Sequence, residues 1–169
     1  MASHDTNGEK VQSLNKYCSY LDPESQLSRI GSLSDDRKTI QPLAFISGTS
    51  LSNLYEVIEA GESRIAPSGE PLQAATTRIQ APISGRDILC VGKNYAAHAQ
   101  EFNKSGYDSS DKVDQPTHPV IFTKRFTSVV ANRDEIYPHS EFTSTADYEG
   151  ELGVIIGKAG FRIAEKDAM

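Results

Sequence analysis

Residues 147–157 of this 169-residue chain read DYEGELGVIIG, an acidic stretch that leads into an apolar one. The apolar run predicts a β-strand over residues 148–157. In a strand, Glu149 and Glu151 would point to the same face, with backbone positions roughly 7 Å apart. Two ionised carboxylates beside a core repel each other and lose hydration, so the pattern favours a divalent cation between them. The stretch therefore predicts two metal ligands, Glu149 and Glu151, and the alternative is a solvated strand face.

A second candidate site follows the apolar stretch ILCVG, residues 88–92, which predicts a short strand. The next stretch, NYAAHAQEF, predicts a short helix on which His98 and Glu101 share a face. A glutamate that accepts a hydrogen bond from one imidazole nitrogen leaves the other nitrogen available as a base. The pair predicts a base that activates water, and the alternative is a surface histidine on an amphipathic helix.

Two further side chains have more ordinary alternatives. Lys124 follows an apolar strand predicted at residues 120–122, where it either pairs with an anionic substrate group or is simply solvated. Cys90, within ILCVG, is expected to be a small buried apolar residue, because no base partner is apparent in the sequence. With Cys18 it makes two cysteines in all, so the sequence predicts no disulfide framework and a reducing compartment.

The first half of the chain predicts a small unit of strands and one helix. Alternation in KYCSYL and the apolar residues at 27–33 predict two strands. The period of SLSNLYEVIEAGE predicts a helix, with Asn53 and Glu56 as a capping box and Gly61 at its end. Residues 66–82 are rich in Pro, Ser, Gly and Thr, and predict a linker with one short strand at 77–80. Residues 1–14 are polar and aperiodic, and predict a mobile leader.

Composition excludes several classes of protein. The net charge of −6 and the pI of about 5.2 argue against a nucleic-acid surface. No apolar run reaches the length of a membrane span. The first 16 residues contain neither an apolar signal region nor an arginine, so a cytoplasmic location is expected ahead of a mitochondrial one.

Taken together, DILCVGKNYAAHAQEF, PVIFTKR and DYEGELGVIIGK resemble, in order and spacing, the start of the catalytic domain of the fumarylacetoacetate hydrolase family. RIGSL and PLAFISGTSLSNLYEVIEAG resemble the small region that precedes that domain. The resemblance covers residues 15–169. It implies a β-rich α+β fold, with a small N-terminal domain at 15–80 followed, at 81–169, by an incomplete first part of a mixed β-sandwich roll.

The resemblance also implies an activity. Family members cleave or decarboxylate C–C bonds beside a carbonyl in acylpyruvates, oxaloacetate, fumarylacetoacetate and related oxo acids, usually as homodimers that bind Mg²⁺ or a similar ion. By position, Glu149 and Glu151 match the family's paired metal carboxylates, and His98 and Glu101 match its water-activating pair. Lys124 matches a substrate lysine, although Arg125 follows it where a proline is usual. Mn²⁺ and Ca²⁺ suit paired carboxylates as well as Mg²⁺ does.

One departure from the family pattern leaves an alternative open. The family's third metal carboxylate is an aspartate well beyond the paired glutamates, and this chain ends at Met169 before such a residue. The isolated chain is therefore expected neither to fold cooperatively nor to turn over an oxo acid. The alternative function is a truncated, inactive chain that acts, if at all, by associating with a full-length relative. A simple Ca²⁺ loop in DYEGE is disfavoured, because it lacks the twelve-residue EF-hand spacing.

Overall fold

The computed structural model describes residues 16–106, 113 and 115–168. The leader predicted at 1–14 lies outside these residues. The chain divides into two units, one formed by residues 1–82 and 131–169, the other by residues 83–130. The domain division predicted at residue 80 stays a prediction.

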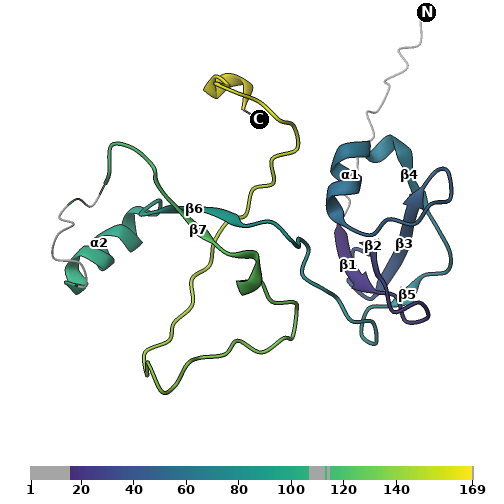
Figure 1. Cartoon of the computed structure of the whole chain (residues 1–169), viewed down its shortest axis with the longest axis horizontal. Coiled ribbons are helices and arrows are strands. Elements are labelled where there is room, and N and C mark those ends of the chain that lie inside the picture. Colours follow the sequence, from purple (N-terminus) through teal and green to yellow (C-terminus); the bar gives the residue numbers. More distant parts are fainter. Residues whose placement is uncertain (1–15, 107–112, 114, 169) are drawn as a thin grey trace, which may run out of the picture. The chain divides into compact units, whose positions relative to one another are not determined.

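The first unit is built on an antiparallel sheet (Figure 1). Its strands run in the order β1-β2-β3-β4, and β5 pairs with the start of β3. Their bounds are Tyr17–Leu21 (β1), Ser28–Leu33 (β2), Thr39–Phe45 (β3), Ile65–Pro67 (β4) and Leu72–Gln73 (β5). The first two strands confirm the sequence prediction, whereas β3, β4 and β5 were not predicted.

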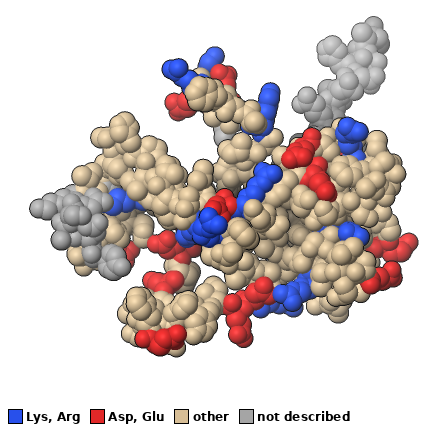
Figure 2. All heavy atoms as spheres, in the orientation of Figure 1, with Lys and Arg blue, Asp and Glu red and all other residues tan. Residues whose placement is uncertain are grey.

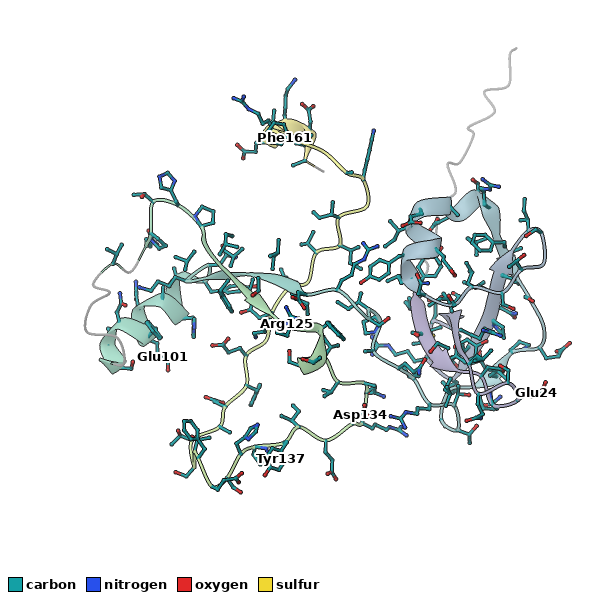
Figure 3. All side chains as sticks on the ribbon, viewed as in Figure 1. Glu24, Glu101, Arg125, Asp134, Tyr137 and Phe161 are labelled. Atoms are coloured by element: carbon teal, nitrogen blue, oxygen red, sulfur yellow. The ribbon has the colours of Figure 1, made fainter. Side chains whose placement is uncertain are left out.

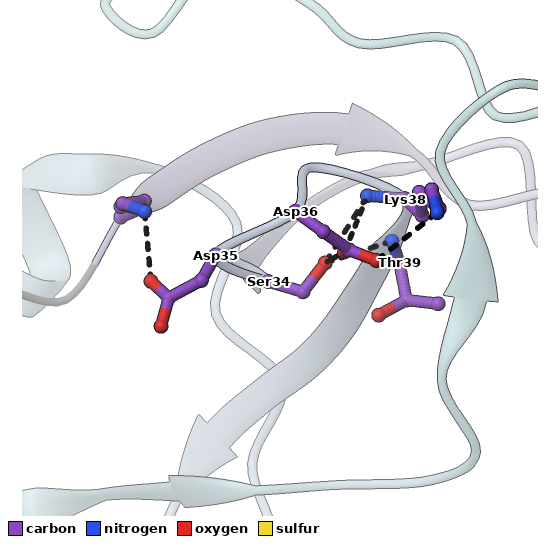
Figure 4. Close-up of polar contacts among 6 residues, drawn as sticks. Ser34, Asp35, Asp36, Lys38 and Thr39 are labelled. Atoms are coloured by element: carbon purple, nitrogen blue, oxygen red, sulfur yellow. Dashed lines mark hydrogen bonds and ion pairs between the residues drawn. The ribbon is translucent and has the colours of Figure 1, made fainter.

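A hydrogen-bonded turn joins β2 to β3 (Figure 4). The Ser34 hydroxyl accepts hydrogen bonds from the backbone amides of Lys38 and Thr39, at 3.1 and 3.0 Å. The Asp36 carboxylate accepts from the Ser34 hydroxyl at 2.8 Å and from the Lys38 amide at 3.1 Å. These bonds hold Asp36 ionised and place its pKa below the usual range, the Ser34 hydroxyl being the largest cause. The local sequence thus sets the register of the β2–β3 pair.

Helix α1, Leu54–Ala60, packs on this sheet and closes its core. Ile30, Leu51 and Val57 are buried together, and Leu51 has no exposed surface. The predicted cap is confirmed, because the Asn53 side chain accepts a hydrogen bond from the Glu56 amide at 3.2 Å. The Glu56 carboxylate reaches back one residue further than predicted, to the Ser52 amide at 2.7 Å. Gly61 ends α1 with φ 78°, as predicted.

A single bridge replaces the short strand predicted at 77–80. Ile79 pairs with Tyr20 of β1, the Leu21 amide donates to the Arg78 carbonyl at 2.9 Å, and the Gln80 amide donates to the Ser19 carbonyl at 2.8 Å. Residues 78–80 therefore run along the outer edge of β1, but the pairing is too short to form a ladder.

The second unit is a two-stranded ribbon and a helix (Figure 1). Strand β6, Ile88–Gly92, pairs antiparallel with β7, Val120–Lys124, so that Cys90 lies opposite Phe122. Between them comes α2, Ala96–Ser105. All three elements were predicted from hydrophobic pattern. Cys90 is half-buried rather than fully buried.

The strand predicted over residues 148–157 is wrong. Within the described residues from 131 to 168, the chain forms no strand, and its one regular element is the 3₁₀ turn Glu165–Asp167. The side chains of Leu152 and Val154 are 84% and 83% exposed. A strand exists only where a neighbouring strand takes up its backbone hydrogen bonds, and no described segment pairs with this one. The β-rich α+β fold class is nevertheless confirmed by the two antiparallel sheets and two helices.

Candidate active-site residues

Helix α2 carries the predicted base pair. His98 and Glu101 are both exposed, three residues apart, and therefore on neighbouring positions of one helix face. Figure 3 shows Glu101 projecting from the helix. Ala99 is the buried residue of α2. The arrangement leaves both side chains accessible to a small molecule, as proton transfer requires.

The turn from β6 into α2 holds a lysine that the sequence did not single out. Lys93 has φ 55°, a left-handed conformation that costs a non-glycine residue about 1 kcal/mol. Its Nζ donates to the Asn103 Oδ1 at 3.2 Å and to the Val113 carbonyl at 2.7 Å. It also lies 5.6 Å from the centroid of the Phe102 ring. A lysine ten residues before Asn103 carries no recognisable sequence pattern, so only the fold brings these groups together.

A hollow of about 340 Å³ opens beside this turn. It lies at the end of β6, next to the first residue of α2 and the segment that leads into β7. Its lining includes both apolar and polar side chains: Val91, Lys93, Asn94, Gln115, Thr117 and His118. The volume is within the range of pockets that take small molecules. His118, to which the sequence assigned no role, contributes to this hollow from the loop before β7.

Lys124 ends β7 and is exposed. The residue after it, Arg125, forms an ion pair with Asp87, Nη1 to Oδ2 at 2.9 Å. The other oxygen of Asp87 accepts a hydrogen bond from the Phe126 amide at 2.9 Å. Asp87 therefore binds both residues that follow Lys124, Arg125 through its side chain and Phe126 through its backbone amide. The family resemblance marked Arg125 only as a departure from the usual proline. Its ion pair with Asp87 forms because β6 and β7 pair antiparallel, and no sequence pattern indicated it.

Glu149 and Glu151 lie on the irregular, exposed segment described above, in the other unit. Gly150 separates them, and no heavy atom lies within 4 Å of where its Cβ would be. Glu149 and Glu151 thus belong to one unit, and His98, Glu101 and Lys124 belong to the other. That the five residues share one site stays a prediction.

The donor set partly fits a hard divalent cation. Two carboxylates separated by one small residue are the ligand type that Mg²⁺ and Ca²⁺ prefer. Within residues 16–106, 113 and 115–168, however, no group of three or more His, Cys, Asp or Glu side chains is placed to hold an ion. The role of Glu149 and Glu151 as ligands therefore stays a prediction.

Charged side chains are interspersed over the surface. On the face drawn in Figure 2, Lys and Arg lie among Asp and Glu and do not gather into a basic patch. No helix in the described part of the chain is long and apolar enough to cross a membrane.

Comparisons with known proteins cover the second half of the chain and, for two of the relatives below, part of the first half. The family described as fumarylacetoacetate (FAA) hydrolase, C-terminal, matches residues 87–169. The chain is 43% identical over 93 residues to the oxaloacetate tautomerase YisK of Bacillus subtilis, covering 54% of this chain and 29% of that protein. It is 31% identical over 154 residues to the mitochondrial oxaloacetate tautomerase fahd2 of Xenopus laevis, covering 86% of this chain and 45% of that one.

A human relative, the mitochondrial oxaloacetate tautomerase FAHD2B, is 33% identical over 126 residues, covering 69% of this chain and 36% of the relative. The chain thus spans less than half the length of each of these three relatives. No solved structure matches. The match of the family to residues 87–169 includes α2, Lys124 and both glutamates, and the relatives are named for one reaction. Residues 87–169 of this chain therefore belong to the fumarylacetoacetate hydrolase family.

Proposed function

We propose that this protein acts on a small oxo acid of the oxaloacetate type, with His98 and Glu101 as its proton-transfer pair. The observation that carries the proposal is the placement of both side chains on one exposed face of α2, directly after β6, within the residues that match the family. The names of the bacterial, frog and human relatives favour oxaloacetate as the substrate.

The reaction we favour is keto–enol interconversion. A base removes a proton from the carbon beside the carbonyl, and the resulting enolate takes a proton on oxygen. His98, oriented by Glu101, is the proposed base. Cleavage of a C–C bond beside the carbonyl is the second candidate, because the same His–Glu pair suits activation of water and cleavage also leaves an enolate.

We also propose a divalent ion, Mg²⁺ ahead of Mn²⁺ or Ca²⁺, with Glu149 and Glu151 as two of its ligands. When bound, such an ion stabilises negative charge on an enolate oxygen. Lys124, exposed at the end of β7, is the proposed partner of a substrate carboxylate. A homodimer and a cytoplasmic location stay predictions; two of the three relatives described above are named mitochondrial.

The test follows oxaloacetate enol by its ultraviolet absorbance with purified protein and Mg²⁺. His98→Ala is expected to lower the rate by about 100-fold or more, the usual contribution of a general base. Glu101→Gln and Lys124→Met are expected to lower it less. Lys104→Met is the matched control, since Lys104 is an exposed lysine on the same helix.

Two results would count against the proposal: no turnover by the protein, or unchanged turnover in His98→Ala. If the chain alone is inactive but raises or lowers the activity of a full-length relative when the two are mixed, the non-catalytic alternative is favoured instead. Loss of activity on addition of EDTA, with recovery on Mg²⁺, tests the metal separately.

A further inference from the structure

Helix α2 is weakly held by its own sequence. It has ten residues, shorter than the length at which an isolated helix is stable in water. Its N-cap, Tyr95, makes no capping hydrogen bond with its side chain, and its first turn contains no acidic residue. Ala99 alone among its residues is buried. The orientation of this helix therefore depends on contacts from outside it.

Lys93 supplies such contacts from the end of β6. Its backbone has a left-handed conformation directly after the strand, and its side chain reaches Asn103 in the last turn of the helix. There the ammonium group meets the Asn103 Oδ1 at 3.2 Å and the Phe102 ring at 5.6 Å. A cation near the C-terminal end of a helix is also favoured by the helix dipole.

The same ammonium group reaches beyond the helix. It donates to the Val113 carbonyl at 2.7 Å, twenty residues along the chain. One side chain therefore connects three places: the end of β6, the last turn of α2 and the segment that leads towards β7. Phe102 and Asn103 follow Glu101 directly, so this connection lies next to the proposed proton-transfer pair.

We propose that Lys93 is a positioning residue, which sets the orientation of α2 and with it the placement of His98 and Glu101 relative to β6. Its role in turnover rests on the proposed function, whereas its role in fixing α2 does not. Two of its N–H groups are directed to Asn103 and Val113, so we expect removal of the ammonium to change substrate binding less than turnover.

The experiment is amide hydrogen–deuterium exchange on the full chain, followed over residues 99–103. Lys93→Met keeps the aliphatic stem but removes the ammonium, and is expected to speed exchange of these amides at least tenfold. Lys93→Arg is expected to restore exchange to within threefold of the unmodified chain. Asn103→Leu, which removes one acceptor and leaves the Val113 bond, is expected to give an intermediate value. Lys104→Met, on the same turn, is expected to change nothing.

The proposal is overturned if the unmodified chain shows no protection over 99–103, if Lys93→Met exchanges like the unmodified chain, or if Lys104→Met has an equal effect. It is also overturned if Lys93→Met removes protection equally from β6 and β7, since the residue would then support the whole unit. Where the protein turns over oxaloacetate, Lys93→Met is expected to lower kcat tenfold with KM within twofold. Absence of turnover would contradict the proposed function and leave the exchange result standing.

Discussion

Gly31 lies at the centre of the first sheet, opposite Cys18 on β1 and Pro42 on β3. A Cβ added here would overlap Ile40 Cγ2 and would lie 3.0 Å from the Gln41 carbonyl oxygen. Gly31→Ala is therefore expected to lower the free energy of unfolding by about 1–3 kcal/mol, because a well-packed core resists added volume. Urea unfolding followed by tyrosine fluorescence measures the change, since the chain has seven tyrosines and no tryptophan.

Gly150→Ala is the matched control for this prediction. Its added Cβ meets no heavy atom within 4 Å, so the unfolding free energy should stay the same. An equal loss in both variants would show that the crowding around Gly31 is not what destabilises the sheet.

Cys18 is half-buried in β1. Burial raises the pKa of its thiol to about 11, although a hydrogen bond from the Gly31 backbone opposes the rise. At pH 8 the thiolate should be about 100-fold scarcer than for an ordinary cysteine, because the pKa is about two units higher. Alkylation of Cys18 by iodoacetamide, measured in a Cys90→Ser variant, should be slow at pH 8, rise about tenfold with each pH unit, and level off only near pH 11.

The same variant unfolded in urea should react at the ordinary rate, and this is the control. The unfolded thiol loses its proton near pH 9 and the folded one near pH 11, so stabilisation is complete below pH 9 and is lost as the pH rises towards 11. Rapid alkylation of the folded variant at pH 8 would contradict the buried placement.

At the scale of elements, the β6–β7 ribbon is closed at one end by Asp87. Asp87→Ala removes both the ion pair to Arg125 and the acceptor for the Phe126 amide. The guanidinium is 71% exposed, so the ion pair contributes little, and most of an expected loss of about 1 kcal/mol comes from the amide hydrogen bond. The measurement is hydrogen exchange of the β6 and β7 amides, which should quicken about fivefold by the same free energy.

Asp134→Ala offers a comparison, because Asp134 pairs with Arg78 in the other unit at 3.3 Å. Figure 3 labels both Arg125 and Asp134. That variant should leave exchange in β6 and β7 unaltered. If Asp134→Ala speeds exchange of the β6 and β7 amides as much as Asp87→Ala does, the effect of Asp87→Ala does not come from the loss of its contacts with Arg125 and Phe126.

Elements with a strong local pattern were predictable, and those that depend on a partner were not. The sequence of helix α1 contains both the helical spacing of its apolar residues and its capping residues. Four of the strands, β1, β2, β6 and β7, have a recognisable apolar or alternating pattern. Strand β3 was missed because Pro42 argues against a strand, yet it is tolerated where its missing amide is not needed. The predicted strand at 148–157 failed for the opposite reason, since its apolar residues have no described strand beside them.

The candidate site divides in the same way. His98 and Glu101 were recognisable because helical spacing alone puts them on one face. Lys93 and Asp87 were not, because their partners lie ten or more residues away and become neighbours only through the turn after β6 and the pairing of β6 with β7. Ion binding by Glu149 and Glu151 needs further ligands, and a local sequence pattern does not reveal which residues would supply them.

On the scale of the whole molecule, burial is concentrated in residues 16–82. Apart from Ala99, the buried residues of the described chain lie there. By contrast Tyr148 and Phe161 are 90% and 87% exposed. We therefore expect hydrogen exchange in two classes: slow for the β1–β3 amides, and close to the rate of an unstructured peptide for residues 147–163.

Limited proteolysis gives a second measurement of this prediction, with early cuts expected within residues 131–168 and a resistant fragment that contains 16–80. Slow exchange over 147–163 in the purified chain would mean that these apolar side chains are covered in solution, for example by a second copy of the chain.

The pairing of residues 78–80 with β1 has a consequence for how the protein behaves at high concentration. An outer strand with free amides and carbonyls invites the same strand of another molecule to join it, which is a route to strand exchange and fibres. Here the Ser19 carbonyl and the Leu21 amide are already taken by Gln80 and Arg78. The segment that leads to the second unit thus also covers the β1 edge of the sheet and protects that edge from pairing with another molecule.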